Sequence, residues 1–254
     1  MGRYARVLRN GERRWVEAGD DVVRVLSGDP FLASTHPEET LLREDLDRLS
    51  FTPPTDAAKI VGLAFNYKSL VGAREDYDEP LFFLKSPTSA CGHKARISRP
   101  RFATKVWVEV ELGVIIKKEC RSVSVDDASD YILGYTIGSD VTAENIYGRD
   151  WHLARSKALD GFAPLGPFLV TDLDTSDLAV ETRINGRLFQ QGRTSDRILN
   201  DRESVSLISQ YLTLTPGDVI LTGTPAGATD SLVSVGDTVT HRIEGIGELS
   251  FDFV

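Results

Sequence analysis

Short apolar runs separated by Gly, Pro and Asp recur along most of the chain, which is the pattern of a protein built mainly from β-strands. The strongest runs are rich in β-branched and aromatic residues and occupy 59–67, 105–118, 131–141 and 237–243. Asn185-Gly186, between "AVETRI" and "RLFQQG", is a strong β-hairpin signal. Because strands far outnumber helices in this pattern, we predict a mixed β-rich (α+β) fold rather than a doubly wound α/β fold.

Helical spacing of apolar residues is confined to a few short segments. Residues 202–212 ("RESVSLISQYL") carry an apolar stripe at helical spacing, and residues 125–132 ("VDDASDYI") predict a second helix with Asp126 or Asp127 near its cap. A short helix is also expected near 43–49 ("REDLDRL"). The chain therefore has few helices, all of them short.

The first quarter of the chain differs in composition from the rest. Residues 3–25 predict a β-meander with a turn at Asn10-Gly11, whereas residues 28–55 are polar and end at the double proline Pro53-Pro54. We therefore divide the chain into a small N-terminal β domain, residues 1–55, and a larger domain, residues 56–254.

Two glutamates interrupt the most hydrophobic strand. Glu109 and Glu111 lie two positions apart in "KVWVEVELGVIIKK", so both side chains should point to the same face of the strand. Like charges at this spacing repel unless something neutralises them. One interpretation is an acidic, solvated face opposite Lys or Arg, and the other is a divalent cation bound by both carboxylates.

A cation of the Mg²⁺ type would require a third acidic group, because it prefers several hard oxygen ligands. Asp140 ends the next apolar strand, "YILGYTIGSDV", and is the candidate. Its alternative role is to cap a helix over "AENIYG". Three carboxylates and waters suit both Mg²⁺ and Mn²⁺, so the sequence does not choose between these metals.

Composition and charge narrow the class of partner. The chain of 254 residues has a net charge of −9 and carries no basic run, which argues against binding nucleic acid or an anionic membrane. Its start, "MGRYARVLRNGERRW", lacks the apolar core of a signal peptide, and two cysteines in a chain of this length are typical of a reduced compartment. We therefore expect a cytoplasmic protein.

Nine motifs occur in the order in which one enzyme family carries them, from about residue 59 to residue 249. They are "VGLAFNY", "PLFFLKSPTSACG", the E-x-E of "VEVEL", "ILGYTIGSDVTA", "RSKALDGFAPLGPFLV", "INGRLFQQGRTSD", "LTPGDVILTGTPAG", "VGDTV" and "IEGIGEL". In these residues the chain resembles the fumarylacetoacetate hydrolase (FAH) family. The resemblance implies a fold of stacked, rolled β-sheets, a homodimer and one divalent cation, Mg²⁺ or Mn²⁺, in each active site.

The resemblance also assigns site residues. Glu109, Glu111 and Asp140 fall on the family's metal-ligand positions, and Lys157 falls on its catalytic lysine beside the substrate. Three further residues fall on its substrate-binding positions, namely Gln190, Thr194 and Thr224. The implied substrate is a small 2-oxo acid, whose carboxylate and neighbouring carbonyl oxygen can chelate a metal that stabilises an enolate.

This sequence departs from the family's hydrolases on the lid that follows the Asn-Tyr motif. Those members carry a His and a Glu that activate water, whereas this chain has Leu70 and Ala73, and neither can move a proton. His93 is the remaining histidine closest to the pocket motifs. The stretch "AENIYGRDWHLARSKALDGFAP" instead resembles the decarboxylase half of the homoprotocatechuate-pathway enzyme, which also lacks the lid histidine.

The sequence therefore favours a metal-dependent enzyme that decarboxylates small 2-oxo or enol (di)carboxylic acids, or moves a double bond or enol proton in them. One alternative is hydrolysis of a C–C bond in acylpyruvate- or fumarylacetoacetate-type diketo acids with a different base. Another is a non-catalytic protein that binds a 2-oxo acid.

Overall fold

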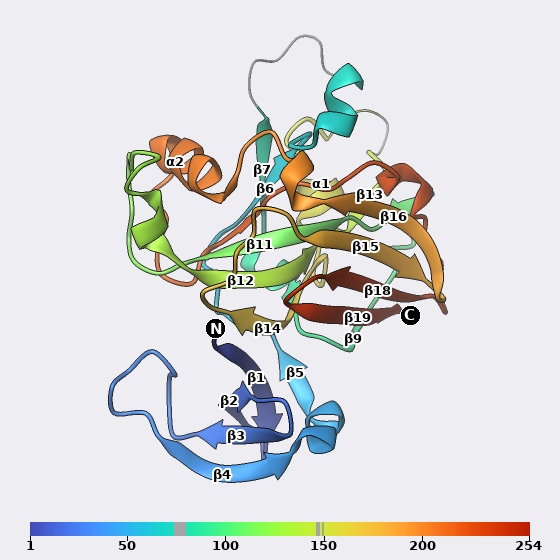
Figure 1. Cartoon of the computed structure of the whole chain (residues 1–254). Helices are drawn as coiled ribbons and strands as arrows, with labels where there is room; N and C mark the ends of the chain where they lie inside the picture. Colours follow the sequence, from blue (N-terminus) through green and yellow to red (C-terminus); the bar gives the residue numbers. More distant parts are fainter. Residues whose placement is uncertain (74–79, 146–147, 149) are drawn as a thin grey trace.

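The computed structural model describes residues 1–73, 80–145, 148 and 150–254 (Figure 1). Over these residues the chain is mostly β-strand, with a few 3₁₀ segments and two α-helices, α1 (Ala154–Lys157) and α2 (Asp201–Tyr211). None of the helices in these ranges is both long enough and apolar enough to cross a membrane. Cys91 and Cys120 are both free thiols.

The largest sheet runs through the whole molecule. Its hydrogen-bonded order is β4-β3-β2-β1-β14-β12-β11-β17-β6-β7, with β5 paired to β1 and β8 paired to β14. Its strands are β1 (Arg3–Arg9), β2 (Glu12–Ala18), β3 (Val22–Leu26), β4 (Pro37–Leu42), β5 (Ser50–Thr52), β6 (Ile60–Ala64), β7 (Leu81–Lys85), β8 (Ala90–Cys91), β11 (Val110–Ile116), β12 (Ile132–Ser139), β14 (Ala163–Val170) and β17 (Val219–Leu221).

A second sheet packs against the middle of the first. Its order is β16-β15-β18-β19-β9, and it contacts β11, β12 and β14 of the large sheet (Figure 1). Its strands are β9 (Ala95–Ile97), β15 (Ala179–Ile184), β16 (Arg187–Arg193), β18 (Thr238–Ile243) and β19 (Gly247–Phe253), and a separate short pair consists of β10 (Val106–Trp107) and β13 (Thr142–Ala143). The predicted mixed β-rich fold is confirmed.

The main hydrophobic core lies between these two sheets. Leu112 of β11 and Ile137 of β12 belong to the same buried cluster as Val180 and Leu249 of the second sheet. Val205 of α2 joins a second cluster with Val114 of β11, and Ile115, on the other face of β11, belongs to a third. Because both of its faces are covered and it lies between β12 and β17, all seven residues of β11 are buried.

The N-terminal strands continue the large sheet. β1 pairs with β14 through Arg3 and Tyr4, and buried β1 and β2 residues such as Ala5 and Val16 join the main core cluster. Figure 1 shows these strands as a layer at one end of the molecule. The division at residue 55 stays a prediction. The large sheet and the main core cluster both contain residues from each side of this division.

Most of the expected local elements form. The structure has the meander over β1 to β3, the hairpin turn at Asn185 and Gly186, both with positive φ, and α2 with a capping box made by Asn200 and Glu203. The expected helix over 125–132 is only a 3₁₀ turn, Ala128–Tyr131, as is the segment Arg43–Arg48. Strand β4 lies in the polar segment where no strand was expected.

One predicted strand is divided. Residues 105–118 form β10 and then, after a break at Val108 and Glu109, β11. β10 turns away to pair with β13, whereas β11 pairs with β12 and β17. Glu109 therefore lies in the break and not within a continuous strand.

Candidate active site

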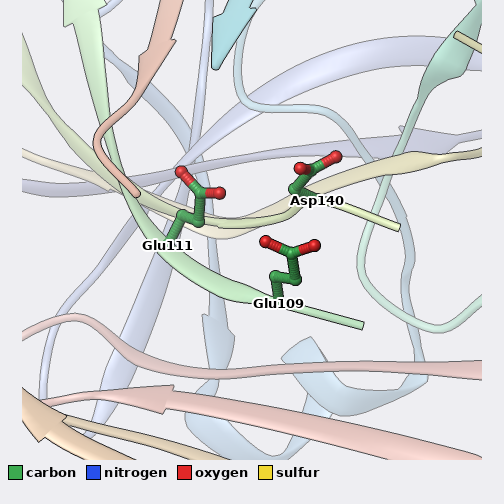
Figure 2. Close-up of side chains that lie close together, drawn as sticks. All are labelled: Glu109, Glu111 and Asp140. Carbon is green, nitrogen blue, oxygen red and sulfur yellow. The ribbon is translucent and has the colours of Figure 1, made fainter. Parts of the chain in front are cut away.

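Three carboxylates converge where β11 and β12 meet (Figure 2). Glu109 lies just before β11, Glu111 lies within it and Asp140 directly follows β12, and one oxygen of each lies within 4.8 Å of the others. The backbone fixes this arrangement, because the N–H of Asp140 donates to the carbonyl oxygen of Glu109 (2.9 Å). Glu111 and Asp140 are buried, and Glu109 is partly exposed. The three side chains expected to bind a metal thus lie together.

Two lysines contact this carboxylate cluster. Lys157, the last residue of α1, donates to Asp140 Oδ2 and to Glu109 Oε1 (3.3 Å). Lys85, the last residue of β7, donates to Asp140 Oδ1 and to the carbonyl oxygen of Val141 (3.1 Å). The ammonium group of Lys157 also lies over the ring of Phe83, with Nζ 4.5 Å from the ring centroid. Both ammonium groups are held at the site.

Lys85 is a site residue that was not predicted from the sequence. Its signal was a lysine at the end of the otherwise apolar strand "PLFFLK", the same pattern that singled out Asp140 at the end of "YILGYTIGSD". Lys85 is 3% exposed, and a lysine is rarely buried to this degree without a partner. Both members of this ion pair, Lys85 and Asp140, lie at the end of an apolar strand. The same pattern could therefore have predicted Lys85 as well as Asp140.

The charges of the cluster do not balance. Three carboxylates face two ammonium groups, and Glu111 accepts its hydrogen bond from the backbone N–H of Gly223 (2.5 Å). Burial, together with the charges of Asp140 and Glu109, raises the pKa of Glu111 well above its ordinary value. Additional positive charge would relieve this repulsion.

The pKa values of the two lysines are shifted in opposite directions. Burial lowers the pKa of Lys157, but the charges of Asp140 and Glu109 more than compensate, and the net result is a raised pKa. Burial also lowers the pKa of Lys85, and here the attraction of Asp140 does not compensate. Lys157 is therefore the lysine held firmly in the charged form.

The donor set fits a hard divalent cation. Three carboxylate oxygens within reach of one another are the ligands that Mg²⁺ and Mn²⁺ prefer, and water or substrate oxygens complete such a shell. Oε1 of Glu109 also accepts hydrogen bonds from Trp107 Nε1 (2.8 Å) and Thr142 Oγ1 (3.0 Å). These donors hold the Glu109 carboxylate in one orientation, as ligand-supporting groups do in metal sites.

A cavity of about 420 Å³ opens beside the cluster. Glu109 and Lys157 contribute its charged groups, and its other polar lining residues are Thr142, Asn145, Ser156, Thr224 and Thr229. The rest of its described lining is largely apolar and includes Leu63, Phe65, Leu70, Phe83, Trp107 and Leu153. A small anion can therefore meet charged groups at one end of the cavity and apolar side chains at the other.

The three expected substrate-binding residues lie in different places. Thr224 lines the cavity, and Gln190 lies behind it, donating from Nε2 to Thr224 Oγ1 (2.9 Å). Thr194 lines another cavity, where its hydroxyl donates to the carbonyl oxygen of Thr175 (2.7 Å) and accepts from the N–H of Leu178 (2.7 Å). The structure thus brings Thr224 and Gln190 to the acidic site and engages Thr194 elsewhere.

Comparison with known proteins identifies the family. The sequence model of the fumarylacetoacetate (FAA) hydrolase C-terminal domain matches residues 59–254. The chain belongs to the fumarylacetoacetate hydrolase family. A protein of Archaeoglobus fulgidus described as uncharacterized is 40% identical over 80% of this chain and 82% of its own length.

Two other FAH-family proteins carry functional names. The homoprotocatechuate catabolism bifunctional isomerase/decarboxylase of Escherichia coli is 36% identical over 92% of this chain and 55% of its own length. The 2-hydroxyhepta-2,4-diene-1,7-dioate isomerase of Mycobacterium marinum is 35% identical, with a TM-score of 0.89 over 100% of this chain and 98% of that one. The resemblance to the FAH family and the FAH-type fold are both confirmed.

The structure describes only part of the lid region. Leu70 lines the cavity, at the position where a histidine was expected. The side chain of Ala73 and residues 74–79 lie outside the described residues. The ring of His93 packs edge-on against Phe51, with centroids 4.9 Å apart, and its Nδ1 accepts from the N–H of Ser250 (3.0 Å). His93 is therefore engaged between strands and not part of the described lining of this cavity.

Proposed function

We propose that this FAH-family protein is a divalent-metal-dependent enzyme acting on small 2-oxo or enol carboxylic acids, which it decarboxylates or isomerises through an enolate. The single observation that supports this proposal most is the convergence of three carboxylates with Lys85 and Lys157 beside one cavity. The cation would be Mg²⁺ or Mn²⁺, bound by Glu109, Glu111 and Asp140. When bound, it would act as a Lewis acid toward the substrate's carboxylate and 2-oxo oxygen.

Lys157 is the residue placed to assist the chemistry directly. Its ammonium group lies at the cavity beside Glu109 and stays charged, so it can attract an anionic substrate and stabilise negative charge that develops on the 2-oxo oxygen. Thr224 adds a hydroxyl to the same cavity. The apolar wall formed by residues such as Phe83 and Trp107 keeps water away, which strengthens these electrostatic interactions.

The cavity favours decarboxylation or isomerisation over C–C hydrolysis. Hydrolysis requires a group that removes a proton from the attacking water, and Leu70 stands where the family's hydrolases have a histidine. Loss of CO₂ from a β-keto acid requires that the resulting enolate be stabilised, and movement of an enol proton or double bond requires in addition a proton transfer, but neither requires an activated water. The names of the isomerase of M. marinum and the isomerase/decarboxylase of E. coli agree with this preference.

The test is a panel of 2-oxo acids, including oxaloacetate and aromatic-catabolic 2-oxo dicarboxylates, incubated with Mg²⁺, with Mn²⁺ or with EDTA. We expect products that have lost CO₂ or moved a double bond, identified by mass, and no turnover in EDTA. Asp140→Asn should abolish turnover, whereas Glu181→Gln on the far side of the second sheet should leave it unchanged. Full activity in EDTA contradicts the proposal.

The same experiment separates the alternatives. Release of pyruvate together with a second carboxylic acid would identify a C–C hydrolase. Tight binding of oxalate with no turnover on the whole panel would identify a 2-oxo acid binding protein. Each outcome has a distinct mass or calorimetric signature, so the reaction class is decided by one set of samples.

A further inference from the structure

A buried line of hydrogen bonds runs behind the cavity through four strands. Ser139 Oγ lies 2.8 Å from His241 Nε2, and His241 Nδ1 lies 3.0 Å from Thr182 Oγ1. Thr182 Oγ1 is 2.8 Å from Gln190 Oε1, and Gln190 Nε2 reaches Thr224 Oγ1 at 2.9 Å. The first four residues are at most 1% exposed. The line begins next to Asp140 and ends at the cavity wall.

Two backbone neighbours show which way the Gln190 amide points. The N–H of Val110 can only donate, and it points to Gln190 Oε1 (3.3 Å). The carbonyl oxygen of Pro225 can only accept, and it lies 3.0 Å from Gln190 Nε2. The amide oxygen therefore faces Thr182, and the amide nitrogen faces Thr224.

This orientation determines where each proton in the line lies. Because Gln190 Oε1 can only accept, the single hydroxyl proton of Thr182 is directed to it, and Thr182 Oγ1 must accept from His241. His241 therefore carries its proton on Nδ1, and its bare Nε2 accepts from the hydroxyl of Ser139. Burial lowers the pKa of His241 to about 3, so that the ring is neutral near pH 7, as this pattern requires.

At the other end, the line dictates the role of Thr224. The amide of Gln190 donates to Thr224 Oγ1, which commits one lone pair of that oxygen and leaves its own proton to be donated. Thr224 lines the cavity beside Lys157 and Glu109, so this proton can be directed toward a bound ligand.

We propose that Ser139, His241, Thr182 and Gln190 form a directional hydrogen-bond relay that holds the Gln190 amide in this orientation and so directs the proton of the Thr224 hydroxyl to an anionic oxygen of the bound acid. Thr182 and His241 act through Gln190 and are positioning residues. Their contribution is selectivity for a carboxylate over a neutral hydroxyl or amide donor at this point of the cavity. The identity of the ligand, a small 2-oxo acid, rests on the proposed function.

The first test reads the relay without any ligand. Nitrogen-15 NMR of the imidazole rings distinguishes the two neutral tautomers from the charged ring, and the chain has only four histidines to assign. We expect one ring, absent in His241→Gln, that carries its proton on Nδ1 and does not titrate between pH 5 and pH 8. A proton on Nε2, or a ring that titrates in this range, overturns the relay.

The second test measures the binding of oxalate in the presence of Mg²⁺ by calorimetry. We expect Thr182→Val and Thr224→Val each to weaken oxalate binding about tenfold, the value of one hydrogen bond to a charged group. Because Thr182 acts through Thr224, the double variant should bind no more weakly than Thr224→Val alone. Thr182→Ser, which keeps the hydroxyl, should restore the wild-type affinity.

The matched control is Thr136→Val, which removes the hydroxyl of another fully buried threonine that has no hydrogen-bond partner among the described residues. It should bind oxalate as the wild type does. Additive losses in the double variant, or wild-type affinity in Thr182→Val, contradict the proposal. No oxalate binding by the wild type with Mg²⁺ contradicts the proposed function instead, and the tautomer of His241 then decides the relay independently.

Discussion

At the scale of single residues, the negative charge of Glu111 has opposite effects on the stability of the fold and on the binding of a metal. Glu111 is buried beside two other carboxylates, and this burial together with their charge raises its pKa well above the ordinary value. In the absence of a cation, its negative charge therefore opposes folding. The same charge is what a divalent cation would bind. Removing it should help the fold and harm metal binding.

Glu111→Gln tests this trade-off, because glutamine keeps the shape and can still accept from the N–H of Gly223. We expect the free energy of unfolding in EDTA to rise by about 1 kcal/mol, since a poorly compensated buried charge is removed. The affinity for Mn²⁺, measured by calorimetry, should fall by about a hundredfold or more. Glu181→Gln is the surface control, and equal Mn²⁺ affinity in both variants would contradict the assignment of Glu111 as a ligand.

His241 predicts a specific dependence of stability on pH. Burial lowers its pKa from 6.5 to about 3, so between these values the unfolded chain binds a proton that the folded chain does not. Stability from this group is complete above pH 6.5 and is lost as the pH falls, by at most about 1.4 kcal/mol per pH unit.

The measurement is urea unfolding at several pH values between 4 and 8 for the wild type and for His241→Gln. Carboxylates contribute equally to both proteins, so the difference between the two curves isolates the histidine. We expect the wild type to lose stability faster than the variant below pH 6.5. Parallel curves would show that the ring titrates alike in the folded and unfolded chain.

At the scale of secondary structure, turns with a backbone requirement were the most predictable. Asn185-Gly186 was expected to close a hairpin, and the structure has β15 and β16 joined there with positive φ at both residues. The helix 202–212 was predicted from the helical spacing of its apolar residues, and the structure has α2 there, with a capping box that was not predicted. These signals depend on neighbouring residues in the sequence, so no tertiary information is needed to read them.

Gly186→Ala tests the turn directly. Gly186 has a φ of +80°, and an added Cβ would meet no atom within 4 Å, so the only cost is backbone strain. We expect the substitution to lower the free energy of unfolding by about 1–2 kcal/mol. Gly28→Ala, where φ lies outside the positive region and the Cβ would be 3.4 Å from a threonine hydroxyl, is the control and should change stability little.

Elements that depend on partners distant in the sequence were not predicted. Strand β4 carries exposed, polar residues, and it forms because β3 offers it an edge. The break before β11 arises because β10 leaves the sheet to pair with β13, more than thirty residues further along. The side-chain alternation that placed Glu109 and Glu111 on one face assumed a continuous strand. The two carboxylates nevertheless lie together, because Asp140 binds the backbone of Glu109 across the break.

At the scale of the whole molecule, the N-terminal strands are joined to the rest of the chain by a sheet. β1 pairs with β14, and Ala5, Val7 and Val16 are fully buried in the main core cluster. The sequence signalled a boundary through its prolines and polar residues. It could not show that the strands before the boundary hydrogen-bond to a strand more than 150 residues later.

We therefore expect residues 56–254 to be much less stable alone than in the full chain. Removal of residues 1–55 leaves the edge of β14 unpaired and exposes apolar core surface, both of which favour aggregation. Thermal unfolding by circular dichroism and light scattering of the two proteins would measure this. A truncated chain that unfolds cooperatively at the full-length temperature would show instead that the two parts are independent.

The resemblance to the FAH family also predicts a homodimer. Light scattering of the full chain should give twice its mass of 28.0 kDa. A monomer at micromolar concentration would contradict this expectation.

The three carboxylates lie in or directly beside β11 and β12 in the interior of the large sheet, whereas Leu70, which lines the cavity, belongs to the 3₁₀ segment Lys68–Ala73. Replacements in this segment would leave the backbone that holds the carboxylates unchanged. The group of residues proposed to bind a metal is therefore part of the folded interior, whereas the residue that differs from the family's hydrolases lies outside the sheets and can be substituted at little cost to the fold.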